Sequence, residues 1–441
     1  MTGITVSDIA RLTGGKLING GGERRVSGVV IDSRLVRDGF AFAALPGERA
    51  DGHDYISKAF ELGAACCIAL RVPSGETRPL VIVSEVAEAL ASLAEGYRKT
   101  LELPLIAVTG SVGKTTTKEM LAAVLSRRFN TLKTEKNLNN ELGVPLTLFR
   151  IDASHEAAVV ELGISHFGEM TRLAQMARPT MAVFTVIGRA HLEFLGDRDG
   201  VLRAKGELLD CMAKDAAVLV NGDDDKLSAL CCTQKKITFG LGASCDVRAE
   251  DLVSDGVSTS CDIICGERRL RVRIPAFGQH MVYAALAAAA VGMRLGMSDA
   301  ELAEGIAAYS TVGRRASVVD TGSLTLIDDC YNANPDSVAS AVRSASALGG
   351  RLVCILGDML ELGENTAELH KKTGELALSK GALLLTVGEL SKNMGGLSFD
   401  TKSELISALP RLLKKGDRVL VKASHSMAFE EISDAIKGLS L

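Results

Sequence analysis

The stretch Leu105-Ile-Ala-Val-Thr-Gly-Ser-Val-Gly-Lys-Thr-Thr-Thr117 decides the fold of this chain. Its apolar start, residues 105–108, is typical of a buried parallel strand, and a helix is expected to begin near Lys118. A glycine-rich turn between a strand and a helix surrounds an anion with backbone N–H groups and the helix N-terminus. The stretch therefore predicts a phosphate-binding loop at one end of an α/β sheet.

The residue types in this loop match the chemistry of a bound triphosphate. Gly110 and Gly113 let the backbone approach the ligand. Lys114 supplies a positive charge for the β- and γ-phosphates, and the Thr115 hydroxyl is placed to bind Mg²⁺. Val108 stands where the standard Walker A pattern has glycine, so the loop is a shorter variant. A chance glycine-rich turn is the alternative, but it does not explain why all these residue types occur together.

Composition limits the class of protein. The chain has 441 residues, 47% apolar and 24% charged, which suits a globular protein of two or three domains. Its net charge of −4 gives no reason to expect nucleic acid or an anionic membrane as a partner. The longest apolar stretch, residues 281–293, is too short to span a bilayer, and the N-terminus lacks the pattern of a signal peptide.

The ten cysteines indicate a reducing compartment. Two pairs are sequence neighbours, at 66–67 and 231–232, and adjacent cysteines do not suit a disulfide framework. Cys261 and Cys265 have no second ligand pair at zinc spacing. We interpret the cysteines as small apolar residues and expect a cytoplasmic protein with small-molecule partners and no membrane insertion.

Three blocks of strand and helix patterns follow one another along the chain. Strands are expected at 28–31, 40–44, 66–69, 80–83, 105–108, 157–162, 181–187, 217–220, 324–328, 352–356, 382–387 and 419–422, a β-rich region at 240–273, and helices at 54–62, 86–99 and 280–295. Alternation of this kind implies βαβ units and mostly parallel sheets. We expect an α/β fold with a small N-terminal domain at 1–102, a central P-loop domain at 103–312 and a Rossmann-like C-terminal domain at 313–441.

Three further residues have side chains suited to catalysis or metal binding. Glu161 ends an apolar strand, where its carboxylate can reach a metal near the phosphate loop, but a solvated strand-end glutamate is an equal alternative. His191 follows another apolar strand and is either a metal ligand or a structural histidine. Lys205 lies on a predicted helix, where the residues alone favour an exposed lysine.

Longer motifs, in order along the chain, resemble those of the Mur ligase superfamily. They include Asp32-Ser-Arg34, Asp51-Gly-His-Asp54, Asn137-Leu-Asn-Asn140, Glu161-Leu-Gly163, Ala190-His-Leu-Glu193 and Ala204-Lys-Gly-Glu207. In the third block, Asp328-Asp-Cys-Tyr-Asn-Ala-Asn-Pro-Asp-Ser337 and Leu356-Gly-Asp-Met-Leu-Glu-Leu-Gly363 resemble the branch of the superfamily that adds D-alanyl-D-alanine. The resemblance extends from one end of the chain to the other.

This resemblance implies an ATP-dependent amide ligase of peptidoglycan precursor synthesis, and hence a role in cell-wall biogenesis, cell shape and cell division. UDP-MurNAc-tripeptide would be activated as an acyl phosphate and joined to D-alanyl-D-alanine, forming UDP-MurNAc-pentapeptide. The implied cofactors are ATP and Mg²⁺, with two metal ions, together with a Lys205 that captures CO₂ as a carbamate and becomes an anionic ligand. We expect the protein to act as a monomer.

The resemblance also implies roles for individual residues. Catalytic roles are implied for Lys114, Lys205, His191 and Glu161, and metal binding for Thr115, Glu161 and His191. ATP contacts are implied for Gly110, Ser111, Gly113, Lys114, Thr115, Thr116, Arg314, Asn332, Asn334 and Asp336. Contacts to the UDP-sugar peptide are implied for Ser33, Arg34 and Asn139. Arg34 has the alternative of a purely structural ion pair.

Three positions depart from the family pattern. The family usually has Asn where this chain has Val186, Met281 and Ala284, so amide groups expected near the nucleotide are missing. A catalytically weakened relative that binds nucleotide or UDP-sugar as a regulator is therefore an alternative, although the catalytic candidates are all retained. A P-loop kinase acting on a hydroxyl is a further alternative, but the sequence shows neither a base nor a lid signature for it.

Overall fold

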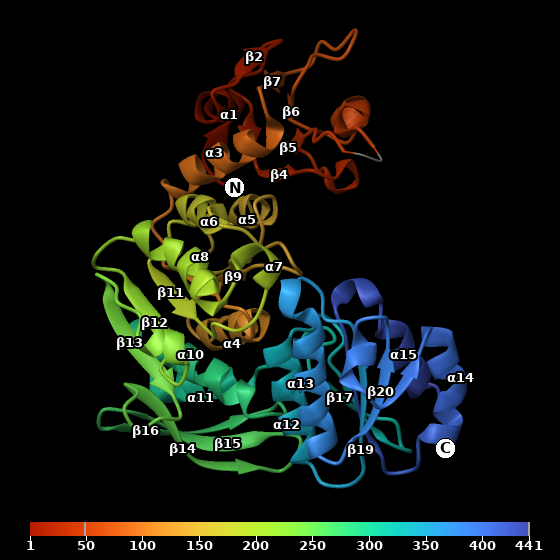
Figure 1. Ribbon diagram of the computed structural model, residues 1–441. Helices are drawn as coiled ribbons and strands as arrows, with labels where there is room; N and C mark the ends of the chain where they lie inside the picture. The colour runs from red at the N-terminus through yellow and green to blue at the C-terminus, as the bar shows by residue number, and fades with distance from the viewer. Residues whose placement is uncertain (48–49, 440–441) are drawn as a thin grey trace.

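The structure is a computed structural model that describes residues 1–47 and 50–439. Three α/β domains follow one another along the chain (Figure 1). The N-terminal domain, in red and orange, sits on one end of the central domain, and the C-terminal domain, in blue, lies against its side. The arrangement confirms the α/β class and the mostly parallel sheets expected from the sequence.

The N-terminal domain is built on a sheet of order β2-β7-β6-β5-β4, in which β2 is antiparallel and the others are parallel. Its elements are β1 (Ile4–Thr5), α1 (Val6–Thr13), β2 (Lys16–Ile18), β3 (Arg25–Val26), β4 (Gly28–Val30), β5 (Phe40–Ala43), α2 (Ile56–Glu61), β6 (Cys66–Ala69), β7 (Leu80–Ile82) and α3 (Val86–Arg98). The helix expected at 54–62 has two parts. The Asp51 carboxylate accepts the His53 N–H, so a 3₁₀ turn (Gly52–Tyr55) precedes α2.

The central sheet has the order β16-β15-β14-β13-β12-β11-β8-β10-β9. Its strands are β8 (Leu105–Thr109), β9 (Thr131–Lys133), β10 (Ala157–Glu161), β11 (Met181–Phe184), β12 (Ala217–Asn221), β13 (Lys235–Gly240), β14 (Val247–Ser254), β15 (Thr259–Cys265) and β16 (Arg268–Ile274). Every neighbouring pair from β9 to β14 in this order, including those made by β8, is parallel. Strand β15 pairs antiparallel with both β14 and β16, and these three strands form the expected β-rich edge. Strand β8 lies between β10 and β11, so the phosphate loop projects from the middle of the parallel region.

The helices of the central domain are α4 (Lys114–Leu125), α5 (Gly143–Leu148), α6 (Glu169–Ala177), α7 (Leu192–Leu195), α8 (Arg198–Asp210), α9 (Asp225–Ser228), α10 (His280–Arg294) and α11 (Asp299–Ala307). Helix α4 begins at Lys114 and not near Lys118, so this expected boundary was wrong. Three consecutive β-branched threonines, 115–117, have low helix propensity, but the loop ends at Gly113 and packing overrides that preference. The phosphate loop therefore leads directly into the first helical turn.

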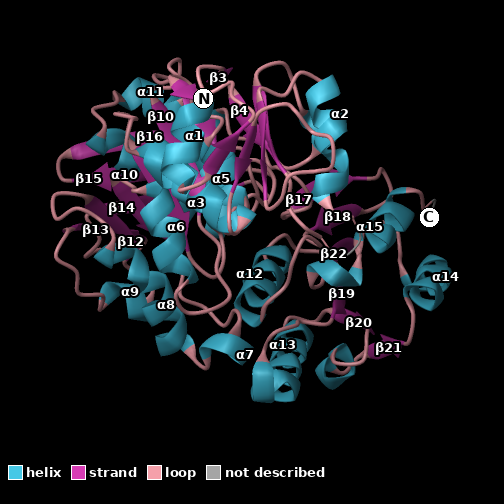
Figure 2. Ribbon diagram, turned by 90° about the horizontal axis from the view of Figure 1, so that it is seen from above, coloured by secondary structure: helices cyan, strands magenta, loops and turns pink. Residues whose placement is uncertain are grey.

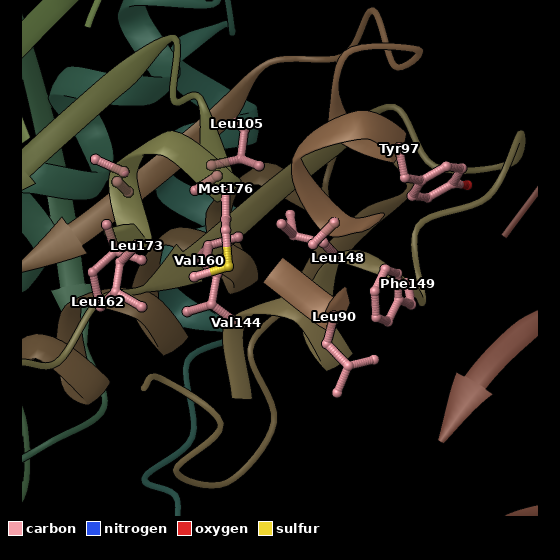
Figure 3. Packing of buried hydrophobic residues seen from close by; sticks show 14 of the residues in the cluster. Leu90, Tyr97, Leu105, Val144, Leu148, Phe149, Val160, Leu162, Leu173 and Met176 are labelled. Atoms are coloured by element: carbon pink, nitrogen blue, oxygen red, sulfur yellow. The ribbon is translucent and has the colours of Figure 1, made fainter. Parts of the chain in front are cut away.

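Helix α3 joins the N-terminal and central domains in one hydrophobic core (Figure 3). Leu90 and Tyr97 of α3 belong to the same cluster as Val144 and Leu148 of α5. The Tyr97 hydroxyl donates a 2.6 Å hydrogen bond to the Ile151 carbonyl. A buried polar tip that finds a partner stabilises such a contact, so the N-terminal domain rests on a packed and bonded surface.

A second core lies between the central sheet and the alanine-rich α10, which packs against α4. The small alanine side chains let α10 and α4 approach closely. Helix α11 also packs against α4. A Cβ added at Gly305 of α11 would lie 2.4 Å from the Val124 Cα of α4, so the contact between α11 and α4 requires glycine. The packing fixes the position of α4 and therefore of the phosphate loop.

The C-terminal sheet has the order β17-β18-β22-β19-β20-β21, in which β17 is antiparallel and the others are parallel. Its elements are β17 (Ser317–Asp320), β18 (Thr325–Asp328), α12 (Pro335–Ser346), β19 (Leu352–Gly357), α13 (Thr366–Ser379), β20 (Leu383–Val387), β21 (Leu397–Phe399), α14 (Lys402–Leu412), β22 (Arg418–Lys422) and α15 (Glu430–Lys437). Seen from above (Figure 2), α12 and α13 lie on the side of this domain that faces α7. None of the helices in the described part of the chain has the length and apolar surface that crossing a lipid bilayer needs.

Candidate active site between the central and C-terminal domains

A cavity of about 1070 Å³ lies between the central and C-terminal domains. One wall consists of the phosphate loop and the carboxyl ends of neighbouring strands, where ligands collect in open α/β sheets. The other wall comes from the loops at the carboxyl ends of β18 and β22 and from α12. The predicted site residues that line it are Ser111, Gly113, Lys114, Thr115, Thr116, Asn139, Glu161, His191, Asn332, Asn334 and Asp336.

The phosphate loop has the backbone geometry of an anion cradle. Gly110 has a φ of +144°, and a Cβ there would lie 2.0 Å from the Thr185 hydroxyl oxygen, so only glycine fits. The Lys114 ammonium donates a 2.8 Å hydrogen bond to the Gly110 carbonyl and so folds back over the loop. Burial lowers the pKa of Lys114. A bound phosphate would offer this cation a stronger acceptor than a carbonyl does.

Glu161, at the end of β10, is buried beside the loop. It is 2% exposed, which contradicts the alternative of a solvated glutamate. Its carboxylate accepts hydrogen bonds from the Thr115 hydroxyl at 3.0 Å and from the Asn139 amide at 2.9 Å. The Lys118 ammonium lies 4.0 Å away and donates to the Thr134 carbonyl. Residues from three separate segments therefore converge on this carboxylate.

The donor set suits Mg²⁺ shared with a substrate phosphate. Among residues 1–47 and 50–439, no group of three or more His, Cys, Asp or Glu side chains is arranged to hold a metal ion. Mg²⁺ commonly takes one or two protein oxygens and completes its shell with water and phosphate. The adjacent Thr115 hydroxyl and Glu161 carboxylate fit that pattern.

His191 of the central domain also lines the cavity, and its side chain is hydrogen-bonded to the C-terminal domain. Its backbone is left-handed, with a φ of +56°, and its Nδ1 is hydrogen-bonded to the Glu361 carboxylate. The Glu193 N–H donates to the Glu361 carbonyl at 3.2 Å. Burial lowers the pKa of His191, with the Glu361 charge opposing. Glu361 lies in a motif singled out in the sequence, but only the tertiary structure shows that it meets His191.

Lys205, on α8, is not the exposed lysine that the residues alone favoured. It is 1% exposed, and within the described ranges its ammonium has neither a hydrogen-bond acceptor nor an ion-pair partner. Burial and, next, the positive charge of Lys114 hold the pKa of Lys205 well below its ordinary value. It does not line the cavity itself. A buried and unpartnered cation is costly, which favours its neutral or modified form.

Of the two adjacent arginines in the C-terminal domain, the structure brings Arg315 and not Arg314 to the cavity. Arg314 pairs with Asp328 and Asp434, each at 2.9 Å, and so holds its own domain together. Arg315 lies with its guanidinium carbon 3.7 Å from the centre of the Tyr331 ring. Two neighbouring residues of the same type could be distinguished only by the path of the loop that carries them.

The other predicted residues of this wall do line the cavity, but two of them have structural partners. Asn334 caps α12 by accepting the Ser337 N–H, with Pro335 in the first turn. The Asp336 carboxylate accepts the backbone N–H of Arg189 and pairs with its guanidinium at 2.7 Å, across the two domains. The C-terminal wall is therefore already closed against the central domain.

The three departures from the family pattern occupy different environments. Val186 and Ala284 line the cavity, whereas Met281 is buried in the core beneath it. Beside them, the Tyr283 hydroxyl donates a 2.9 Å hydrogen bond to the Asp223 carboxylate, and both residues line the cavity. This pair could not be predicted from the sequence, because its members are far apart along the chain.

Ser33 and Arg34 lie on the N-terminal domain and do not line this cavity. The Arg34 guanidinium pairs with the Asp32 carboxylate at 2.6 Å and remains exposed. Hydrogen bonding from Arg34 lowers the pKa of Asp32. The ion pair considered as an alternative role for Arg34 is therefore present, with the guanidinium still open to solvent.

Family models match three successive parts of the chain. They are described as Mur ligase family, catalytic domain (residues 25–98), Mur ligase middle domain (108–292) and Mur ligase, glutamate ligase domain (314–425). A crystal structure of MurF from Acinetobacter baumannii has a TM-score of 0.88 and 29% identity, and the match covers 99% of each chain. The structure of MurF ligase from Thermotoga maritima in complex with ADP has a TM-score of 0.84 and 28% identity, covering 94% of this chain and 97% of that one.

Curated relatives are similar over the whole length. The UDP-N-acetylmuramoyl-tripeptide–D-alanyl-D-alanine ligase of Bacillus subtilis (strain 168) is 35% identical, with 97% of each chain covered. The ligase of the same name from Escherichia coli (strain K12) is 33% identical, with 99% of each chain covered. The chain therefore belongs to the Mur ligase family, in its UDP-N-acetylmuramoyl-tripeptide–D-alanyl-D-alanine ligase branch.

Proposed function

We propose that this protein is an ATP-dependent ligase that joins D-alanyl-D-alanine to UDP-MurNAc-tripeptide. The observation that carries the proposal is the meeting of Lys114, Thr115 and Glu161 in one cavity closed by a second domain. Full-length similarity to ligases of this name supports it over a catalytically weakened regulator or a P-loop kinase. The reaction consumes ATP, so we place it in the cytoplasm. We also propose that the protein acts as a monomer.

The reaction has two steps. A carboxylate oxygen of the tripeptide attacks the γ-phosphorus of ATP, the bond to the bridging oxygen breaks, and ADP leaves from an acyl phosphate. The amine of D-alanyl-D-alanine then attacks the acyl carbon, loses a proton, and displaces inorganic phosphate. A carboxylate is a poor acyl donor, so phosphorylation supplies the leaving group. The enzyme contributes alignment and stabilisation of developing charge.

The residues of the phosphate loop and of the opposite wall would bind ATP in different ways. The N–H groups of the first turn of α4, with Ser111, Gly113 and Thr116, would hold the phosphates, and Gly110 allows the close approach. Lys114 would turn from the Gly110 carbonyl to the transferred phosphoryl group. On the opposite wall, Asn332 and Asn334 would contact ATP, and Asp336 would act through its pair with Arg189. The ATP contact expected for Arg314 is not part of this proposal, because its guanidinium pairs with Asp328 and Asp434.

Thr115 and Glu161 are the residues that would hold Mg²⁺, and a second ion would lie toward His191. Bound there, the metal would supply positive charge that neutralises the phosphate oxygens. The Asn139 amide donates to the Glu161 carboxylate and lines the cavity, where it would contact the UDP-sugar peptide. Ser33 and Arg34 would contact the nucleotide end of the same substrate on the N-terminal domain.

We further propose that Lys205 is carbamylated. Its amine is buried and near the Lys114 ammonium, and it has no partner among the described residues, so its charged form is disfavoured. Reaction of the neutral amine with CO₂ forms an N–C bond and releases one proton, leaving an anionic oxygen pair. That product would pair with the surrounding positive charge of Lys114.

The domains that would carry out these tasks are proposed as 1–102, 103–312 and 313–441. The test of the function is ADP release from ATP with UDP-MurNAc-tripeptide, measured with and without D-alanyl-D-alanine. We expect turnover that depends on the dipeptide and yields a UDP-MurNAc-pentapeptide detectable by mass. Absence of dipeptide-dependent turnover would refute the ligase assignment.

A further inference from the structure

In the described part of the chain, two arginines of the C-terminal wall, Arg315 and Arg343 on α12, have no anionic partner, and Arg315 is the one that is stacked on an aromatic ring. Among residues 1–47 and 50–439, Arg315 forms neither an ion pair nor a side-chain hydrogen bond, although it lines the cavity. Its guanidinium lies over the Tyr331 ring, and that ring also stacks with His425 at a centroid separation of 5.1 Å. All three residues line the same cavity. An arginine stacked on an aromatic face keeps its N–H edge available for an acceptor.

The segment that carries Arg315 is held in an uncommon conformation. The next residue, Ala316, has a φ of +53°, which is rare for a residue other than glycine. Its N–H donates a 3.0 Å hydrogen bond to the Asp329 carboxylate, and the Tyr331 N–H donates to the Arg314 carbonyl at 3.2 Å. The buried Lys422 pairs with Asp329 at 2.7 Å. This strain and these bonds fix the position of Arg315 before any ligand arrives.

Arg315 lines the same cavity as Lys114 and Glu161 of the central domain. Burial lowers the pKa of Lys114, the Glu161 charge opposes this, and the Arg315 charge adds to the lowering. The amine that attacks the acyl phosphate must come within bonding distance of the transferred phosphoryl group. An extended dipeptide spans about 7 Å, so its far carboxylate stays within the same cavity.

We propose that Arg315 binds the C-terminal carboxylate of the amine substrate, with Tyr331 and His425 positioning it. This inference rests on the proposed ligase function and names the anchor of its second substrate. The guanidinium matches a carboxylate through two parallel N–H···O bonds. The other anion in the cavity would be an ATP phosphate, but the loop N–H groups and Lys114 on the opposite wall already serve that group.

The test compares two substrates in two proteins. Wild-type enzyme and Arg315→Gln are assayed with D-alanyl-D-alanine and with D-alanyl-D-alaninamide, which lacks the carboxylate charge. Wild type should prefer the free dipeptide by about 100-fold in kcat/KM, because the site would otherwise leave its cation unpaired. In Arg315→Gln, kcat/KM for the free dipeptide should fall by about the same factor, and kcat/KM for the amide should change little. An unchanged preference in the variant would overturn the proposal.

A partial reaction separates this inference from the ligase assignment. Exchange of labelled ADP into ATP, with UDP-MurNAc-tripeptide and no dipeptide, reports formation of the acyl phosphate alone. Arg315→Gln should leave that exchange and the KM for ATP unchanged. A raised KM for ATP with an unchanged KM for the dipeptide would assign Arg315 to the nucleotide and refute the proposal. Absence of both exchange and dipeptide turnover in wild type would instead refute the ligase function.

Two further variants control for folding and for charge geometry. Arg315→Lys keeps the charge but loses the two-point fork, so it should recover only part of the preference for the carboxylate. Arg411→Gln removes an exposed arginine on α14, outside the cavity, and should match wild type in every assay. If Arg315→Gln has a lowered Tm, the ratio between the two substrates still reports the contact, because both are measured on the same preparation.

Discussion

The Thr115 hydroxyl donates a 3.0 Å hydrogen bond to the buried Glu161 carboxylate and so connects the first turn of α4 to the end of β10. If these oxygens hold Mg²⁺, Glu161→Gln should raise the Mg²⁺ concentration needed for half-maximal rate and lower turnover by about 10²–10³-fold. Initial rates across a Mg²⁺ series would measure this. The amide preserves the shape of the side chain, so the Tm without ligands should change little. Equal Mg²⁺ dependence in both proteins would place the metal elsewhere.

Lys114→Ala tests the phosphate loop. The ammonium is the loop's own cation, and it would bind the phosphoryl group during transfer, so ATP turnover should fall by orders of magnitude. Circular dichroism and the Tm without nucleotide should stay close to wild type, because the lost hydrogen bond is to a single loop carbonyl. Near-normal turnover would show that another segment binds the triphosphate.

The activity of the enzyme should depend on CO₂, because the proposed carbamate on Lys205 forms from it. Lys205→Ala should abolish nearly all turnover, and Lys205→Arg should not restore it, because a guanidinium stays protonated and does not take up CO₂. A small carboxylic acid added to the alanine variant should fill the vacated space and recover part of the rate. Removal of CO₂ should inactivate wild type, and bicarbonate should reactivate it. Full activity of Lys205→Arg would refute the carbamate.

The same lysine should give the unmodified protein a measurable pH dependence of stability. Burial holds the folded-state pKa of Lys205 well below the ordinary 10.5 of the unfolded chain. Between these two pKa values the unfolded chain binds more protons, so the free energy of unfolding rises with pH there. Urea titrations in CO₂-free buffer should show this slope in wild type and a flatter one in Lys205→Met. Identical slopes would mean that the lysine is not buried as described.

The Arg189–Asp336 pair should stabilise the closed arrangement of the central and C-terminal domains. We expect Arg189→Gln and Asp336→Asn each to raise the KM for ATP several-fold and to increase the radius of gyration measured by X-ray scattering. The double variant should be no worse than either single one, because the pair is lost only once. Additive effects would show that the two side chains act independently.

Limited proteolysis should distinguish the two connections between domains. Cutting is expected at 311–313, just before the bonded residues Arg314 and Ala316, and ATP with the UDP-substrate should protect that segment. The connection at 100–104 should resist, because the buried Arg98 guanidinium donates hydrogen bonds to the Leu101 and Leu103 carbonyls. Dominant cutting inside 105–220 would break the proposed division into domains.

Much of the fold was predictable because it depends on local patterns. The apolar run at 105–108 and its glycine-rich turn indicated a strand and a phosphate loop, and both are present at the centre of the sheet. The start of α4 was expected near Lys118 but lies at Lys114, because tertiary packing holds the three threonines in the helix although their propensity for it is low. Local preferences are weak where a buried helix is held by its neighbours.

The residue types of the site were set by the sequence alone, since Lys114, Thr115 and Glu161 could be recognised from their motifs. Only the tertiary structure decided their partners. It paired His191 with Glu361 and turned Arg315, in place of Arg314, toward the cavity. It also buried Lys205, which the residues alone favoured as exposed. Motifs follow from covalent neighbours, whereas burial and pairing depend on how segments hundreds of residues apart pack, and that packing sets the charge each group can carry.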